Sequence, residues 1–252
     1  MMRRLACLAL IPGAICTSAM GQSAGSVITS VGGTWLDFGQ SSTTPLQSSS
    51  AVGTFTSSGT GGQVHNTFTA ELSLTYFVTD NIALDLATGI PPKLKLYAQG
   101  TVAPFGPGGP SLGLGNLQPL ATTRAWPPIL FLKYFFGNAQ TKLRPFVGIG
   151  ANYTWFSHTE LNPTFSGALQ QVAGPGGQVK VSLSPSWNPA FAAGASYNLS
   201  KNWYATASVT YLPLKTNATV SSVAANGQTV LSNTTHITAN PWIAFVGIGY
   251  RF

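Results

Sequence analysis

The chain has 252 residues, and 7% of them are charged, against roughly 25% in an average soluble domain. Five acidic residues cannot supply the charged surface of a water-soluble globular protein, and 44% hydrophobic residues are too many for a disordered coil. The formal net charge of +7 reflects scarce acids, and no basic run indicates a nucleic-acid partner. The composition therefore predicts a protein whose surface faces something other than water.

The first 21 residues have the pattern of a secretory signal peptide. Two arginines precede the apolar run 5–15, which is too short to span a bilayer as a helix, and small residues follow it. Both cysteines, Cys7 and Cys16, lie in this segment. We therefore expect residues 1–21 to be cleaved and residues 22–252 to form a single barrel domain without disulfides.

No later segment offers 18 consecutive apolar residues, so the sequence contains no candidate transmembrane helix. If the chain enters a membrane, a closed β-barrel is the remaining possibility, because lipid cannot satisfy the hydrogen bonds of an open sheet edge.

In chain order, eight segments show alternating hydrophobicity with aromatic and β-branched residues, as strands do. These segments are 26–39, 66–79, 82–97, 122–137, 144–157, 186–199, 203–216 and 237–252. Short turns alternate with long stretches near 40–65, 98–121, 158–185 and 217–236, which are rich in Gly, Pro and Ser and are expected to be mobile loops. This pattern predicts an all-β fold, an eight-stranded antiparallel up-and-down transmembrane β-barrel. A secreted soluble β-protein is an alternative, although it gives no reason for the regular alternation of connections.

Alternate residues of a barrel strand face lipid and lumen, so the polar face of each segment predicts the lumen. In four of the segments every charge falls on the polar face. The predicted lumen residues are Glu71, Asp85, Lys93, Lys95, Phe131, Lys133, Phe245 and Arg251.

Aromatic residues on the opposite face predict two girdles at the membrane boundaries. The turn-side girdle is Tyr76, Tyr134, Phe136, Tyr197, Trp203, Tyr250 and Phe252, and the loop-side girdle is Tyr153, Trp155, Trp187, Tyr211 and Trp242. Along the last strand, the distance from Trp242 to Phe252 corresponds to about 25 Å at a tilt of ~40°, the height of an apolar band. The alternative is that aromatic residues are simply common in strands.

No motif supports catalysis or a cofactor. The glycine pairs around Ile149 and Ile248 are not followed by a helical pattern, so they favour small lumen-facing residues over a nucleotide site. His65, His158 and His236 lie in or beside the long stretches, where solvated histidines are commoner than a shared metal site. No nucleophile has a base in a supporting context, so we expect neither an enzyme nor a cofactor.

Four stretches resemble the OmpW family of small Gram-negative outer-membrane proteins, which includes AlkL-type alkane importers. They are 79–84, 127–137, 143–154 and 240–252. Asn240, where the family often has Asp, and the neutral loops depart from the family pattern. The resemblance implies a narrow, largely apolar barrel interior and passage of small hydrophobic molecules, which leave laterally through the barrel wall.

Two proline pairs give the lateral route a physical basis. Pro91 and Pro92 lie in the third segment and Pro127 and Pro128 in the fourth, and proline cannot donate to a strand ladder. Antiparallel pairing from the turn places them at nearly the same height, which predicts a weakened contact between the two strands. We call this contact the proline seam. The alternative is that the prolines mark strand ends on the loop side.

The sequence therefore predicts a porin-like channel in the bacterial outer membrane for passive uptake of small hydrophobic molecules. The alternative is a structural or adhesive barrel with a plugged lumen and functional loops. The expected partners are outer-membrane lipid, lipopolysaccharide and the solute, with no nucleic acid, and the chain is expected to be a monomer.

Overall fold

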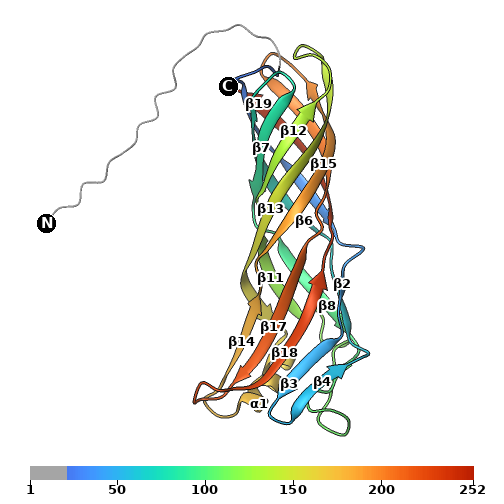
Figure 1. Ribbon diagram of the computed structural model, residues 1–252, viewed down its shortest axis with the longest axis vertical. Coiled ribbons are helices and arrows are strands. Elements are labelled where there is room, and N and C mark those ends of the chain that lie inside the picture. The colour runs from blue at the N-terminus through green and yellow to red at the C-terminus, as the bar shows by residue number, and fades with distance from the viewer. Residues whose placement is uncertain (1–21) are drawn as a thin grey trace, which may run out of the picture.

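The computed structural model describes residues 22–252, so the predicted signal peptide lies outside the described residues. Eight antiparallel strands close into a barrel in the order β12-β7-β6-β1-β19-β16-β15-β13, and β13 pairs with β12 (Figure 1). Their bounds are β1 Val27–Asp37, β6 Thr67–Phe77, β7 Ile82–Gly89, β12 Ile129–Phe135, β13 Leu143–Leu161, β15 Ser186–Asn198, β16 Trp203–Tyr211 and β19 Trp242–Arg251. The predicted all-β, eight-stranded transmembrane barrel is confirmed.

The alternating pattern forms these strands because it gives each one an apolar outer face and a lumen face. In β6, Leu72, Leu74 and Tyr76 point outward, whereas Ser73 and Thr75 are buried in the lumen. Small residues make room for large ones inside the barrel. A Cβ atom on Gly150 would lie 2.7 Å from Cδ1 of Phe131, so glycine on β13 allows this ring to fill the lumen.

The wall continues far beyond the membrane barrel, because the four long stretches fold. They contain β2 Ser42–Thr43, β3 Leu46–Ser50, β4 Gly53–Ser57, β5 Gly61–Val64, β9 Thr101–Val102, β10 Leu112–Gly113, α1 Pro163–Ala173, β14 Gln178–Leu183 and most of β17 Lys215–Val223 and β18 Thr229–Thr238. The predicted strand segments 82–97 and 122–137 supply β8 Lys93–Gln99 and β11 Ala121–Trp126 to the same half. The prediction that the four long stretches are loops is therefore wrong. Serine, threonine and glycine there form ladder hydrogen bonds, as in the pairing of β17 with β18.

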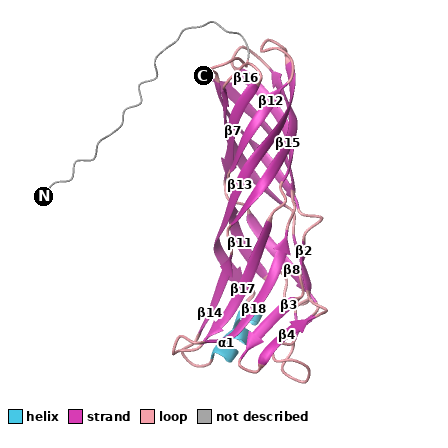
Figure 2. Ribbon diagram, viewed as in Figure 1, coloured by secondary structure: helices cyan, strands magenta, loops and turns pink. Residues whose placement is uncertain are grey.

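Two sheets build this loop-side half (Figure 2). One continues from β13 through β11 and β8 to β5, and the other runs β14-β17-β18-β3-β4. Helix α1 begins after Asn162, whose side chain accepts a hydrogen bond from the Thr164 amide, and it buries Phe165 and Leu169 against the second sheet and the 98–120 segment. Within residues 22–252, no helix has the length and hydropathy needed to cross a membrane.

The third and fourth predicted strands are each interrupted at their prolines. The ladder between β7 and β12 ends at the pair Ala87–Ile129, and the ladder between β8 and β11 begins at Lys93–Arg124. The intervening segment is one residue longer on the β7 side, so the faces of β8 are reversed relative to β7. If the alternation of β7 is continued into β8, the side chains that it places in the lumen therefore point outward instead.

A second pair of strands breaks at Pro213 and Pro241, between β16 and β17 and between β18 and β19. Here the register is preserved, because Tyr211 pairs with Trp242 and Lys215 pairs with Thr238. Backbone hydrogen bonds from Leu212 to Pro241 and from Ala239 to Leu214 bridge the break. This second break therefore leaves the wall continuous. At the proline seam, by contrast, the register shifts by one residue.

Candidate functional site

A cavity occupies the lumen of the membrane barrel. It encloses about 1130 Å³, including the space at its open mouth. Of the residues predicted to face the lumen, Glu71, Asp85, Phe131, Lys133 and Phe245 line it. Arg251 also points inward and is buried, at the turn-side end of β19.

Three charged side chains line this cavity, and two of them form an ion pair. Nζ of Lys133 lies 2.7 Å from Oδ2 of Asp85, and Oδ1 of Asp85 accepts a hydrogen bond of 2.5 Å from Thr75. Glu71 accepts a hydrogen bond of 2.8 Å from Thr34. The Lys133 ammonium also lies over the rings of Phe131 and Phe146, at 5.3 and 4.9 Å from their centroids. The lumen thus combines apolar side chains, Ser and Thr hydroxyls, one ion pair and the carboxyl group of Glu71.

The turn-side end of the lumen is closed. Phe77, Phe135 and Phe146 are buried and in ring contact, and Tyr204 packs with them. Immediately beyond this layer, the guanidinium of Arg144 is 5.8 and 5.4 Å from the centroids of Phe77 and Phe135. These rings block an axial route out of the cavity.

Arg144 ties Gln22, the first described residue, to this end of the barrel. Its Nη1 donates to the backbone oxygen of Gln22 at 2.8 Å, and its Nη2 donates to that of Asp80 at 2.6 Å. The side chain of Gln22 in turn donates to Ser196 at 2.6 Å. Arg144 is 1% exposed, so the sequence prediction missed a buried cation; its place in an alternating strand beside Pro145 gave no sign of this contact.

A second cavity lies in the loop-side half. It encloses about 1080 Å³ with its mouth, and its walls include Leu94, Leu96, Phe156, Phe165 and Leu214. Between the two cavities lies one continuous apolar cluster, which contributes Ile129 and Ile243 to the lower cavity and Leu94 and Leu214 to the upper one.

Phe38 and Leu212 belong to that cluster but line neither cavity, and they are 2% and 1% exposed. Ala125 and Ala190 of the same cluster also line neither cavity, so the cluster as a whole fills the region between the upper and lower cavities, and we call it the constriction.

The lower cavity extends to the barrel wall at the proline seam. Its lining includes Gly89, Ile90, Pro92, Pro127 and Pro128 together with the lumen residues. One backbone hydrogen bond reaches across, from the Ala125 amide to the oxygen of Pro92, at 3.2 Å. The expected pairing of Pro91 with Pro128 differs from the observed register by three residues on the β7 side and two on the β8 side, because Ile82 pairs with Tyr134 at the turn side and residues 88–92 then include one extra residue.

Trp126 is a seam residue that the sequence prediction missed. It lines the lower cavity, stacks on Trp155 with centroids 5.9 Å apart, and donates from Nε1 to Ser157 at 3.0 Å. Its position directly before Pro127 was the available signal in the sequence.

Lys93 and Lys95 do not face the lumen, which corrects their predicted placement. Both are exposed on the outer face of β8, while their neighbour Leu94 is 7% exposed and faces inward. The reversal of faces at Pro91 and Pro92 is the physical reason.

The aromatic side chains predicted to form girdles lie on the outer face, and many contact one another. Ring pairs join Tyr134 to Phe136, Trp203 to Tyr250 and Tyr250 to Phe252 on the turn side. On the loop side, ring pairs join Tyr153 to Trp155 and to Trp187, and Tyr211 to Trp242. Three of these pairs, Trp203–Tyr250, Tyr153–Trp187 and Tyr211–Trp242, link neighbouring strands, and the other three join side chains two residues apart along the chain.

The three histidines lie on separate elements. His65 stacks on Tyr97, His236 contacts Asn217 at 2.7 Å, and His158 lies beside Ser157. In the described part of the chain, no three His, Cys, Asp or Glu side chains are grouped as metal ligands would be.

Comparison with known proteins gives a consistent result. The family model described as the OmpW family matches residues 24–252. Outer membrane protein W of Vibrio cholerae is 31% identical over 181 residues, which are 72% of each chain. Outer membrane protein AlkL of Ectopseudomonas oleovorans is 27% identical over 75% of this chain and 68% of its own. The crystal structure of the outer membrane protein OprG from Pseudomonas aeruginosa superposes with a TM-score of 0.72 at 23% identity, covering 92% of this chain and 98% of that one.

Proposed function

The chain belongs to the OmpW family of outer-membrane β-barrel proteins, and on this premise we propose that it carries small hydrophobic molecules passively into the outer membrane. The solute enters the upper cavity from outside, passes the constriction into the lumen, and leaves through the proline seam into lipid. The family resemblance implies the same class of solute.

One observation carries this proposal: the lower cavity reaches the wall at the proline seam, while its turn-side end is closed by rings and by Arg144. For a solute in the lumen, the least obstructed way out is therefore sideways, through the barrel wall at the proline seam. The distance from Tyr134 to Trp126, eight residues along the strands, corresponds to about 20 Å across the membrane. The seam thus lies near the outer boundary of the apolar band, where a released solute enters the lipid directly.

The chemistry of the route favours apolar solutes over ions. The upper cavity is lined mainly by aliphatic and aromatic side chains, and the apolar constriction would strip water from a polar solute. In the lumen, the pairing of Lys133 with Asp85 neutralises two of the three charged side chains that line the cavity, and Glu71 is the third. An eight-stranded barrel is also too narrow for a wide aqueous pore.

The first test compares uptake of an alkane or a monoterpene with that of a sugar of similar size, using outer-membrane vesicles with and without the protein. We expect faster uptake of the apolar solute alone. Replacing Pro91, Pro92, Pro127 and Pro128 with threonine restores backbone donors across the seam and should reduce that uptake to near the level without protein. Heat-modifiable electrophoretic mobility checks that the variant is folded.

Pro213 and Pro241 provide a matched control, because they interrupt the other strand pair without opening onto the lower cavity. Threonine at these two positions should leave apolar uptake unchanged. Normal uptake by the folded seam variant would contradict lateral release, and equal loss in both variants would mean that proline removal acts on the barrel as a whole.

The second candidate function, a structural or adhesive barrel, also has an observation in its favour. The apolar constriction narrows the axial route, and helix α1 lies at the loop-side end of the molecule (Figure 1). This function predicts no difference in uptake of either solute with and without the protein.

A further inference from the structure

The outer face of the sheet formed by β5, β8, β11 and β13 carries a cluster of positive charge. Lys93 and Lys95 on β8 and Arg124 on β11 are all exposed there. Lys93 lies directly opposite Arg124, and Lys95 lies opposite Thr122. Since cross-strand neighbours on one face have Cβ atoms about 5 Å apart, the three cations share one site, which we call the basic patch.

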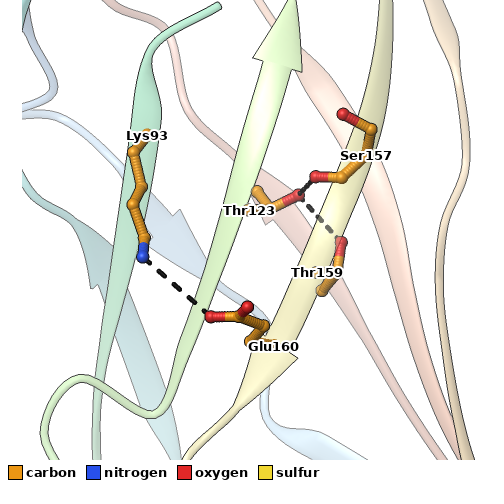
Figure 3. A network of polar contacts seen from close by, with 5 residues as sticks. All are labelled: Lys93, Thr123, Ser157, Thr159 and Glu160. Carbon is orange, nitrogen blue, oxygen red and sulfur yellow. Dashed lines mark hydrogen bonds and ion pairs between the residues drawn. The ribbon is translucent and has the colours of Figure 1, made fainter.

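One acid borders the basic patch and leaves it positive. Oε2 of Glu160 lies 4.0 Å from Nζ of Lys93, reaching across β11 (Figure 3). The two side chains are 52% and 73% exposed, so water screens the pair and it holds neither group firmly. The three cations therefore remain available to an anion, and with one acid beside them the basic patch keeps a net positive charge.

The strands beneath the basic patch are tied together by side chains. Oγ1 of Thr123 donates to the backbone oxygen of Ser157 at 3.2 Å and contacts Oγ1 of Thr159 at 2.8 Å (Figure 3). Trp126 also donates to the Ser157 hydroxyl. These contacts fix β11 against β13 at the bulge where His158 has a φ of 51°, so the basic patch has a preorganised backbone.

The basic patch lies at the height of lipid headgroups. Trp126 and Trp155 stack within the loop-side aromatic layer, and Arg124 is two residues beyond Trp126, about 5 Å farther from the membrane. The loop side of an outer-membrane barrel faces outward, so this is the level of the outer-leaflet headgroups.

Within the described chain, the other two basic side chains of the loop-side half, Lys180 and Lys215, lie on the second sheet, on β14 and β17. The positive charge is therefore concentrated on one sector of the wall. That sector adjoins the proline seam, since Nη1 of Arg124 lies 3.4 Å from the backbone oxygen of Pro91.

We propose that the basic patch binds the phosphate groups of lipid A, the phosphorylated glycolipid of the outer leaflet. The ammonium groups of Lys93 and Lys95 supply point charges, and the planar guanidinium of Arg124 can donate two hydrogen bonds to one phosphate. The exposed indole of Trp126 below them contacts the acyl chains. Binding depends on charge complementarity at this height and does not require that the protein transports a solute.

The test titrates the protein, in a nonionic detergent, with bisphosphorylated lipid A and follows tryptophan fluorescence. K93Q/K95Q/R124Q should weaken binding by more than about tenfold, because each cation contributes to attraction of an anionic headgroup. E160Q should bind as tightly as the unaltered protein or more tightly, since it removes the one acid beside Lys93. Unaltered affinity in the triple variant would overturn the proposal.

K180Q/K215Q is the matched control, with charge removed from the same half of the molecule but from another sheet. Its affinity should stay within about twofold of the unaltered protein, and a loss as large as that of the triple variant would refute a localised site.

Dephosphorylated lipid A should bind more weakly, and equal binding would assign recognition to the acyl chains. Complete displacement of lipid A by millimolar inorganic phosphate would also contradict a lipid site. Heat-modifiable mobility confirms that each variant is folded.

Discussion

The ion pair of Lys133 and Asp85 shows how single residues set the character of the lumen. Their side chains are 11% and 1% exposed, so each charge depends on the other for compensation. D85N or K133M alone leaves one buried charge unpaired and should lower the free energy of unfolding by about 3 kcal/mol or more. The double variant D85N/K133M should lose clearly less than the sum, as measured by urea unfolding in lipid vesicles. Additive losses would show that the two groups are not coupled.

Arg144 acts at the same scale on the turn-side end. R144M removes two charged hydrogen bonds, to the backbone oxygens of Gln22 and Asp80, and should cost roughly 3 kcal/mol of unfolding free energy. The neighbouring exposed residue Lys142 offers a control, because K142M breaks no such contact and should change stability little. An equally stable R144M variant would show that the closed end does not depend on this guanidinium.

At the scale of strands, the extra residue in the segment between β7 and β8 distinguishes the proline seam from the break at Pro213 and Pro241. Deleting Ile90 makes the register of β7 with β12 continuous with that of β8 with β11. We expect the shortened chain to fold, to close the seam and to lose apolar uptake in the vesicle assay. Retained uptake in a folded deletion variant would mean that register has no role in the opening.

At the scale of the whole molecule, the wall extends well beyond the membrane on ordered strands. Backbone amides of β17 and β18 are paired along nine or more residues, so their hydrogen exchange should be slow, on a scale of minutes to hours. Hydrogen exchange of the protein in lipid bilayers, followed by mass spectrometry, measures this directly. Complete exchange of residues 217–236 within seconds would restore the view of these stretches as mobile loops.

The alternating pattern by itself determined the class of fold, the number of barrel strands and the face of most side chains. These follow from local chemistry, because a two-residue period and a lipid environment permit a closed barrel and little else. Lumen positions such as Asp85 and Lys133 could therefore be assigned without coordinates.

The tertiary structure decided what depends on register and on contacts between distant segments. One extra residue near Pro91 reversed the faces of β8 and moved Lys93 and Lys95 outward, and composition carries no record of such a shift. Strand pairing also turned Ser- and Thr-rich stretches into an ordered wall, because their ladder partners lie far away in the chain. Likewise, the apolar cluster of the constriction exists only because the closed barrel brings together residues that are far apart in sequence, such as Phe38 and Leu212.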